Sequence, residues 1–205
     1  MPDQYEFSVD WFTQHWPNWL TVTAERQISK ILEVGSFEGR SACTMIEHFG
    51  KKSPIKIFCV DDWGGSFELD GSDMEAVERR FDRNINRAIS VADQRATIYK
   101  YKGRSIQILS SLLSGGHRAS FDLIFIDGSH EAPDVLGDLV LAYHLCAKNG
   151  LIICDDYLWS GMPHGHEDLL TMPRESIDAF TRIFCRKVQQ LSGLPLYQIY
   201  LRKTG

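Results

Sequence analysis

The chain has 205 residues, of which 43% are hydrophobic and 24% charged, and its formal net charge is −5. These values are typical of a soluble globular protein, and the length suits one domain whose core needs no disulfide or metal. The sequence contains no stripe of lysines and arginines, which disfavours a nucleic-acid partner, and no apolar run approaches the length of a membrane span.

The five cysteines are scattered along the chain, and none forms a Cys-x-x-Cys pair. Because they are odd in number and lie mostly inside apolar runs, they predict reduced, buried thiols of an intracellular protein. The first residues lack a basic segment followed by an apolar one, so we expect no signal peptide and a cytoplasmic location.

Residues 1–29 form an unusually aromatic N-terminal extension. Aromatic side chains recur at three- and four-residue spacing, as on one face of a helix, at Trp11, Phe12, His15, Trp16 and Trp19. Pro17 interrupts this pattern and predicts two short helical pieces. Three interpretations stay open: the rings pack in the core, cover an active-site mouth as a lid, or contact a second copy in a homodimer.

Residues 30–41, with the sequence KILEVGSFEGRS, combine a buried strand, a tight turn and the start of a helix. The apolar run ends at Gly35, and Gly39 follows four residues later; glycine allows positive φ and a close approach of a ligand. The spacing Glu33-x-Gly35-x-x-x-Gly39 differs from the Gly-x-Gly-x-x-Gly of dinucleotide-binding turns. A carboxylate inside the strand suits a cationic or hydroxyl-bearing ligand, and an ordinary strand-to-helix turn is the alternative.

The rest of the chain alternates between strands and helices. Apolar runs predict strands at 56–61, 96–101, 121–127 and 151–156, and helices are expected at 41–48, 73–90, 106–113, 133–145 and 173–185. Ser72 or Asp73 should cap the second of these helices, and Asn149-Gly150 should end the fourth. Residues 157–172 lack periodicity and predict an active-site loop. Strands at 187–191 and 196–202 should form a terminal hairpin.

This alternation predicts an α/β fold: a doubly wound, Rossmann-like sheet of about seven strands with helices on both faces. One strand of the terminal hairpin should run antiparallel, because its short connection cannot make a βαβ crossover. We find no internal repeat or linker, so residues 1–205 should form a single domain.

In such sheets, ligands bind beyond the carboxyl ends of the strands. The predicted strands here end in Gly35-Ser36, Asp61-Asp62, Gly103-Arg104-Ser105, Asp127-Gly-Ser-His130 and Asp155-Asp156. A single acid at such a place is well explained as a cap or turn residue. Three strand ends that all carry acids are harder to explain in this way, because crowded carboxylates repel one another unless a cation lies among them.

The acids suggest two kinds of ligand. Asp61 lies 22 residues after Gly39, near the offset of about 20 residues at which an acid binds ribose hydroxyls in nucleotide-binding folds. Asp127, Asp155 and Asp156 together provide the hard oxygen ligands that a divalent cation such as Mg²⁺ prefers.

Histidines near these acids are candidates for catalysis or metal binding. His130 could act as a general base or as a fourth ligand, and the alternative is a histidine at a helix start bonded to a carboxylate. His164 and His166, in the loop at 157–172, could bind a metal, although solvated loop histidines are commoner.

With these motifs, the chain resembles the class I S-adenosylmethionine-dependent methyltransferases. The resemblance is carried by Glu33-x-Gly35-x-x-x-Gly39, Asp61, Phe121-Asp-Leu-Ile-Phe-Ile-Asp127 and Gly150-Leu-Ile-Ile-Cys-Asp-Asp156, and it covers about Phe7 to Lys203. Asp127-Gly-Ser-His130 and the Asp155-Asp156 pair are similar to the branch of macrocin-type sugar O-methyltransferases and cephalosporin hydroxylase-like proteins. The large substrate-binding additions of the antibiotic-tailoring members are absent from this sequence, so the resemblance does not identify the acceptor.

The resemblance implies roles for individual residues. The cofactor S-adenosylmethionine would be bound by Glu33, Gly35, Ser36, Phe37, Gly39, Ser41, Asp61, Asp62, Trp63, Gly103, Arg104, Ser105 and Asp127. Asp127, Asp155 and Asp156 would hold a divalent metal, Mg²⁺ in the first instance, while His130 and Asp127 would be catalytic. The reaction would be an in-line transfer of the methyl group to a hydroxyl of a small molecule.

Two other functions stay open. One is a metal-free methyltransferase acting on nitrogen or on a protein, in which the acids serve only as caps and cofactor contacts. The other is a nucleotide-binding oxidoreductase, or a non-catalytic module, on the same fold.

Overall fold

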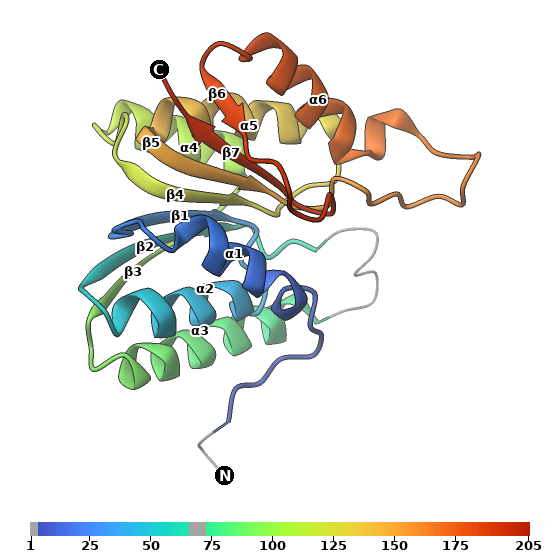
Figure 1. The fold of residues 1–205 in the computed structure, drawn as a ribbon. Coiled ribbons are helices and arrows are strands. Elements are labelled where there is room, and N and C mark those ends of the chain that lie inside the picture. The colour runs from blue at the N-terminus through green and yellow to red at the C-terminus, as the bar shows by residue number, and fades with distance from the viewer. Residues whose placement is uncertain (1–3, 66–72) are drawn as a thin grey trace.

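A computed structural model describes residues 4–65 and 73–205 of the chain (Figure 1). Seven strands form one sheet in the order β3-β2-β1-β4-β5-β7-β6. They are β1 (Lys30–Val34), β2 (Ile55–Asp61), β3 (Ala96–Lys102), β4 (Phe121–Ile126), β5 (Cys146–Cys154), β6 (Val188–Gln190) and β7 (Ile199–Lys203). The first five strands are parallel, and β7 runs antiparallel to both β5 and β6. The predicted α/β architecture is confirmed.

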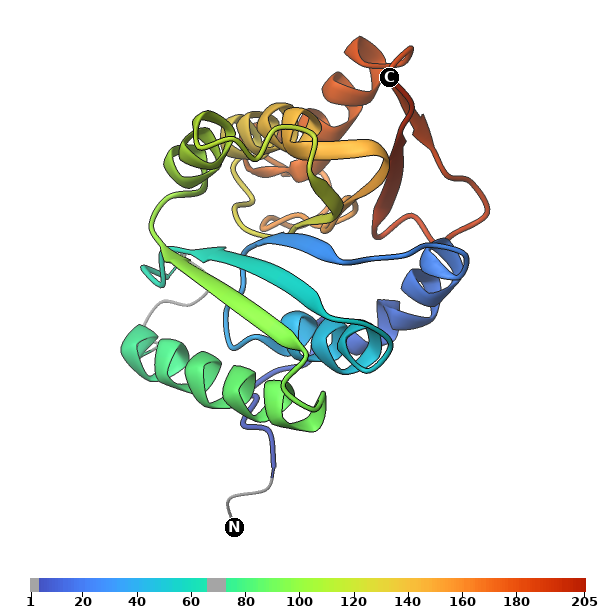
Figure 2. The same ribbon diagram turned by 90° about the vertical axis from the view of Figure 1, so that its left-hand side faces the viewer.

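Helices cover both faces of this sheet (Figure 2). One face carries α1 (Trp16–Thr23), α2 (Arg40–Met45), its continuation as a π-helix η2 (Ile46–Gly50), and α3 (Met74–Val91). The other carries α4 (Ser105–Ser114), α5 (Ala132–Leu145) and α6 (Pro173–Ile183). Short 3-10 helices, η1 (Thr13–His15) and η4 (Leu169–Thr171), complete the elements. Strands β1, β2 and β4 are buried on both faces, which explains why they are continuous apolar runs.

Of the two predicted helix caps, one is confirmed and the other is wrong. Asp73 caps α3 by accepting the N–H of Ala76 at 3.0 Å, whereas Ser72 and most of the loop after Gly65 lie outside the described residues. Asn149-Gly150 does not end α5, because that helix already stops at Leu145. Asn149, at φ +64°, lies instead in an irregular part of β5, next to a shift in its register with β4.

The aromatic N-terminal extension divides into a core part and an exposed part. Pro17 falls in the first turn of α1, after η1, so the two short helical pieces are confirmed. Phe12 and Trp19 are 5% and 0% exposed and pack against Phe125 of β4. Trp11 is 59% exposed. Among the described residues, no helix is both long and apolar enough to cross a membrane.

Four of the five cysteines are buried, as predicted, and Cys185 is exposed.

Candidate active site

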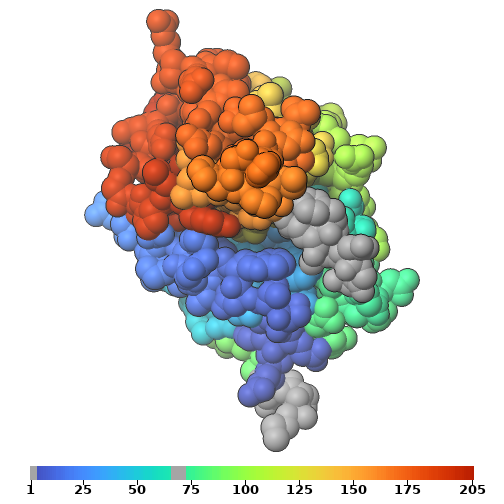
Figure 3. Space-filling view, turned by 90° about the vertical axis from the view of Figure 1, so that its right-hand side faces the viewer, coloured from blue at the N-terminus to red at the C-terminus, as the bar shows by residue number. Residues whose placement is uncertain are grey.

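Backbone hydrogen bonds beyond the strand ends hold the predicted motifs side by side. The N–H of Asp127 donates to Val34 at 2.8 Å, and the N–H of Asp155 donates to Ile126 at 2.9 Å. The ends of β1, β4 and β5 therefore meet at one edge, which is where open parallel sheets bind their ligands. In Figure 3 this edge lies between the N-terminal residues in blue and the residues after β5 in orange.

Gly35 is required because the ends of β1 and β4 lie very close to each other at this edge. Its φ is +84°, and a Cβ atom built on it would lie 1.8 Å from the backbone oxygen of Asp127. A side chain at this position would collide with backbone, which cannot move aside easily. Gly39, at φ +80°, precedes the first residue of α2 and faces the ring of Phe81. The glycine spacing thus reflects two separate packing demands.

Glu33 is completely buried inside the turn that it precedes. Its two carboxylate oxygens accept the hydroxyls of Ser36 at 2.6 Å and Ser41 at 2.5 Å. Burial raises the pKa of Glu33 to about 7, although both hydroxyls oppose that rise. The predicted cofactor residues Glu33, Ser36 and Ser41 therefore form one internal cluster.

Asp61 holds the glycine turn from the end of β2. One carboxylate oxygen accepts the N–H groups of Ser36 and Phe37, both at 2.8 Å, and the other accepts the N–H of Trp63 at 2.7 Å. Burial raises the pKa of Asp61, and these three N–H groups counteract it. Trp63 in turn donates its indole N–H to the carbonyl of Phe37 at 2.9 Å. Contact of Asp61 with a ribose stays a prediction.

The other predicted cofactor residues lie at the rim of this cluster. Asp62 is exposed and accepts the N–H of Gly64 at 2.7 Å. Gly103 donates its N–H to the carbonyl of Asp61 at 2.9 Å, which aligns the end of β3 with that of β2. Arg104 is 3.6 Å from Asp134 in an exposed ion pair, and Ser105 opens α4. The structure brings these residues to the same edge as the glycine turn.

The three aspartates predicted to bind a metal share one neighbourhood. Burial, and then the charges of Asp155 and Asp156, raise the pKa of Asp127 well above its usual range. Burial and the charge of Asp156 likewise raise the pKa of Asp155. Gln198 donates its side-chain N–H to Asp155 at 2.9 Å, and the other oxygen of Asp155 accepts the N–H of Asp156 at 2.8 Å.

His130 pairs with the third aspartate. Its Nε2 lies 2.8 Å from the Oδ2 of Asp156, and its ring stacks on Trp159 with 3.9 Å between centroids. Tyr197 is also hydrogen-bonded to Asp156, and its ring stacks on that of His15. Asp156 has φ +58°, a conformation that few non-glycine residues adopt. This backbone conformation and two aromatic side chains thus fix the histidine–aspartate pair.

These contacts decide whether the acids are arranged as metal ligands. Within residues 4–65 and 73–205, no three His, Cys, Asp or Glu side chains are placed to hold a metal ion. Both oxygens of Asp155 are occupied by Gln198 and backbone, and Asp156 is turned to His130. His164 is exposed and pairs with Glu167 at 2.9 Å. The carboxylates as they stand are therefore not arranged as metal ligands, and the predicted metal site stays a prediction.

Four polar residues near the site were not predicted. Glu38, Asn84 and Gln198 are buried, and Tyr197 reaches Asp156 from the loop before β7. Glu38 carries a signal in the sequence, because it stands between the two glycines of a turn that must pack closely. The other three lie in an amphipathic helix and in a hairpin, where nothing in the local pattern separates them from surface residues.

Comparison with known families agrees with this geometry. A family model described as "Methyltransferase domain" matches residues 32–157, well over half of the chain. The chain belongs to this methyltransferase family. The matched region runs from β1 to the residue after Asp156 and therefore contains the glycine turn, Asp61, Asp127 and His130. The family predicted from the sequence is confirmed.

This chain matches curated relatives only in part. It is 27% identical over 147 residues to the uncharacterized protein R132 of Acanthamoeba polyphaga mimivirus, covering 67% of this chain and 56% of that protein. It is 25% identical over 141 residues to the O-methyltransferase ankF of Aspergillus thermomutatus, covering 69% and 51%. The chain thus spans about half the length of the curated relatives it matches.

Solved structures share the fold of this chain at low identity. An O-methyltransferase of Bacillus cereus in complex with SAH superposes with a TM-score of 0.65 at 18% identity, covering 97% of this chain and 84% of that one. The O-methyltransferase TomG of Streptomyces achromogenes, in complex with SAM, gives 0.61 at 19%, covering 92% and 80%. MycE, in complex with Mg, SAH and mycinamycin VI, gives 0.59 at 14%, covering 97% and 50%.

Proposed function

We propose that the protein transfers a methyl group from S-adenosylmethionine to a hydroxyl group of a small molecule. The observation that carries the proposal is the His130–Asp156 pair, 2.8 Å apart, at the strand ends that also hold the glycine turn. A histidine oriented by a carboxylate is a general base for a hydroxyl proton. The named O-methyltransferases among the relatives support the choice of oxygen.

The residues at the edge fit a cationic cofactor. Glu33, Asp61, Asp155 and Asp156 all raise the pKa of Asp127. A positive charge placed among these acids would relieve their repulsion. S-adenosylmethionine, when bound, supplies a methyl group on a positively charged sulfur.

The protein's own residues would then do the remaining work. His130, whose Nε2 is bonded to Asp156, would accept the hydroxyl proton of the acceptor at its other ring nitrogen, Nδ1, as the oxygen attacks the methyl carbon. Asp156 would stabilise the resulting imidazolium, and the stacked ring of Trp159 would keep the histidine in place. Holding acceptor and donor in line would contribute further to the rate. No covalent enzyme intermediate is needed.

Two measurements test this function. Calorimetric titration with S-adenosylhomocysteine and with NAD should show binding of the first and none of the second. Incubation with labelled S-adenosylmethionine and a panel of phenols, sugars and hydroxylated macrolides should then transfer label to an oxygen. Tight binding of NAD alone would overturn the proposal in favour of an oxidoreductase. Transfer only to amines or to protein would replace the oxygen acceptor.

Assistance by a divalent metal is a second candidate. The observation that favours it is the clustering of Asp127, Asp155 and Asp156, whose mutual repulsion a divalent cation would remove. MycE, which has the same fold, was crystallised with Mg. Because the three carboxylates are not arranged as ligands, the roles proposed for His130 and Asp156 do not depend on a metal. Loss of turnover in excess chelator, restored by Mg²⁺, would support this candidate, and unchanged turnover would remove it.

A further inference from the structure

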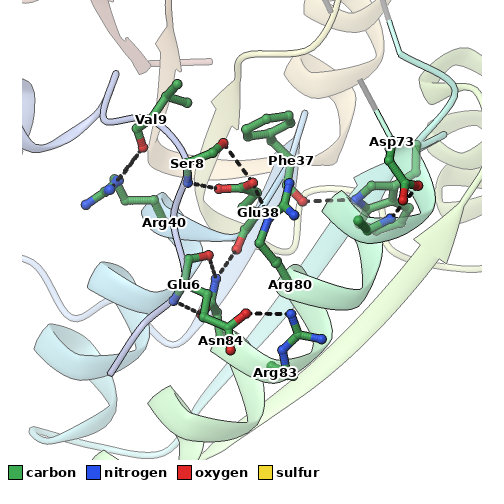
Figure 4. A network of polar contacts seen from close by, with 12 residues as sticks. Glu6, Ser8, Val9, Phe37, Glu38, Arg40, Asp73, Arg80, Arg83 and Asn84 are labelled. Atoms are coloured by element: carbon green, nitrogen blue, oxygen red, sulfur yellow. Dashed lines mark hydrogen bonds and ion pairs between the residues drawn. The ribbon is translucent and has the colours of Figure 1, made fainter. Parts of the chain in front are cut away.

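The glycine turn contains a buried carboxylate that the proposed reaction does not use. Glu38 lies one residue before Gly39 and is only 1% exposed. Charged side chains are rarely buried to this extent unless partners satisfy them. The partners of Glu38 come from two distant segments, namely α3 and residues 4–12, which we call the N-terminal segment (Figure 4).

The carboxylate of Glu38 is fully engaged by these two segments. Its Oε2 accepts the backbone N–H of Ser8 at 2.6 Å, and its Oε1 accepts the hydroxyl of Ser8 at 2.9 Å. Arg80 of α3 donates its Nε–H to Oε1 at 2.5 Å. Only 2% of the Glu38 side chain and 26% of the Arg80 side chain are exposed, so water screens this pair less than a surface ion pair.

Asn84 of α3 joins the glycine turn to the N-terminal segment through the backbones of both. Its side-chain amide donates to the carbonyl of Glu38 at 2.9 Å and to the carbonyl of Glu6 at 3.0 Å. Its Oδ1 accepts the N–H of Glu6 at 2.8 Å. Asn84 is 2% exposed, and breaking one of these bonds would leave a buried polar group unpaired. The turn and the N-terminal segment are therefore held in one relative position.

Phe37, next to Glu38, is tied to the N-terminal segment as well. It has φ +46°, which an L-residue keeps only when its surroundings enforce it. Its ring lies against Trp11, with 5.5 Å between centroids. Arg40, on the other side of Gly39, donates to the carbonyl of Val9 at 2.9 Å. The segment thus contacts the residues on both sides of Glu38.

We propose that Glu38 is a positioning residue that couples docking of the N-terminal segment to the shape of the cofactor turn. The inference rests on the proposed function, because it takes the turn to be the cofactor site. Coupling between two sites is reciprocal. The docked segment therefore raises the affinity for the cofactor, and the bound cofactor holds the segment in place.

A matched pair of variants tests the coupling. Glu38→Gln removes the charge at the centre of the network, and Glu6→Gln makes the same chemical change in the N-terminal segment. The carboxylate of Glu6 pairs with Arg83 in solvent, where both side chains are 53% exposed. We expect Glu38→Gln to weaken S-adenosylhomocysteine binding by about tenfold, or about 1.4 kcal/mol, and Glu6→Gln to stay within about twofold. The KM for S-adenosylmethionine should rise while kcat at saturation changes little.

A second measurement needs no variant. Hydrogen exchange of the wild-type amides of Glu6 and Ser8 should slow further when S-adenosylhomocysteine is added, because both amides donate into the network. Unchanged exchange, or equal affinity in Glu38→Gln and the wild type, would overturn the positioning role. Failure of the wild-type protein to bind S-adenosylhomocysteine would overturn the proposed function, and this inference with it.

Discussion

The two halves of the sheet edge differ in what surrounds their carboxylates. At the ends of β1 and β2, Glu38 and Asp61 accept hydrogen bonds from backbone N–H groups, a hydroxyl and a guanidinium. At the ends of β4 and β5, burial and then the charges of neighbouring carboxylates raise the pKa values of Asp127 and Asp155. In the part of the chain that the structure describes, no lysine or arginine forms an ion pair with either of these two.

In one half, hydrogen bonds to the carboxylates fix the surrounding backbone, and in the other half neighbouring carboxylates repel one another. The β1–β2 half is built so that its backbone is already fixed before a ligand arrives, which lowers the entropic cost of binding. The β4–β5 half stores electrostatic repulsion that only a cation or a proton can relieve. We therefore expect changes in the first half to affect folding and cofactor affinity, and changes in the second to affect turnover.

The largest effect should come from the point where the two halves touch. Gly35→Ala places a methyl group 1.8 Å from the backbone oxygen of Asp127. We expect the free energy of unfolding to fall by roughly 3–5 kcal/mol, with loss of S-adenosylhomocysteine binding. Denaturant unfolding and calorimetry measure both. Gly193→Ala is the control, because Gly193 has the same φ of +84° with no atom within 4 Å. Gly193→Ala should lower the free energy of unfolding by only about 1 kcal/mol. Equal losses in the two variants would mean that the contact with Asp127 does not set the cost at Gly35.

The next effect isolates the chemistry of the β4–β5 half. His130→Gln removes the general base but leaves a side chain that can bond to Asp156. We expect kcat to fall by about 10²–10⁴-fold, while affinity for S-adenosylhomocysteine stays unchanged. Single-turnover methyl transfer gives the rate. His144→Gln, in α5, is the control and should keep full activity. A small change in kcat for His130→Gln would assign the proton to another group.

A smaller effect should separate stability from activity. Asp127→Asn removes one charge from the crowded acids, so we expect Tm to rise by roughly 2–4 °C while turnover is lost. Thermal unfolding at neutral pH measures the rise. In the control Asp122→Asn, also on β4, Tm should fall, because the Oδ2 of Asp122 accepts three hydrogen bonds from Ser29 and Lys30. A fall in Tm for both variants would mean that Asp127 is not under repulsion.

The last effect appears only as pH changes and concerns a carboxylate that belongs to neither half. Asp138 of α5 is 1% exposed, and burial raises its pKa to about 6. The folded state therefore holds a proton that the unfolded state has lost between about pH 4 and pH 6. Stability should fall by roughly 1–3 kcal/mol as pH rises through this range and stay level above it. Asp138→Asn should remove this part of the pH dependence in urea unfolding. An unchanged pH profile would contradict the raised pKa.

The sequence was most informative where one residue type has one physical use. Buried strands must be apolar on both faces, so β1, β2 and β4 could be located from their composition alone. Gly35 could be predicted as part of a close turn, because no other residue fits beside the backbone of Asp127. The clustering of Asp127, Asp155 and Asp156 followed from the rule that parallel strands present their ends at one edge.

The sequence was least informative where a polar residue has several uses. Gln198 could not be distinguished from a surface residue, because its partners Asp155, Trp19 and Tyr200 come together only when β7 pairs with β5. Asn149-Gly150 has the composition of a helix end but serves as an irregularity in a strand. The direction in which Asp61 and Asp156 turn their carboxylates depended on packing that local patterns do not contain.

The place of β7 also sets the order in which the protein can be completed during synthesis. Residues 199–203 form the penultimate strand of the sheet and lie beside β5, although they follow the other strands of this described sheet in the sequence. Until they leave the ribosome, β5 lacks its outer neighbour, and Asp155 lacks Gln198. A nascent chain can therefore build the glycine turn early. The hydrogen bond from Gln198 to Asp155 forms only when β7 pairs with β5, so the acidic end of the sheet edge is completed later.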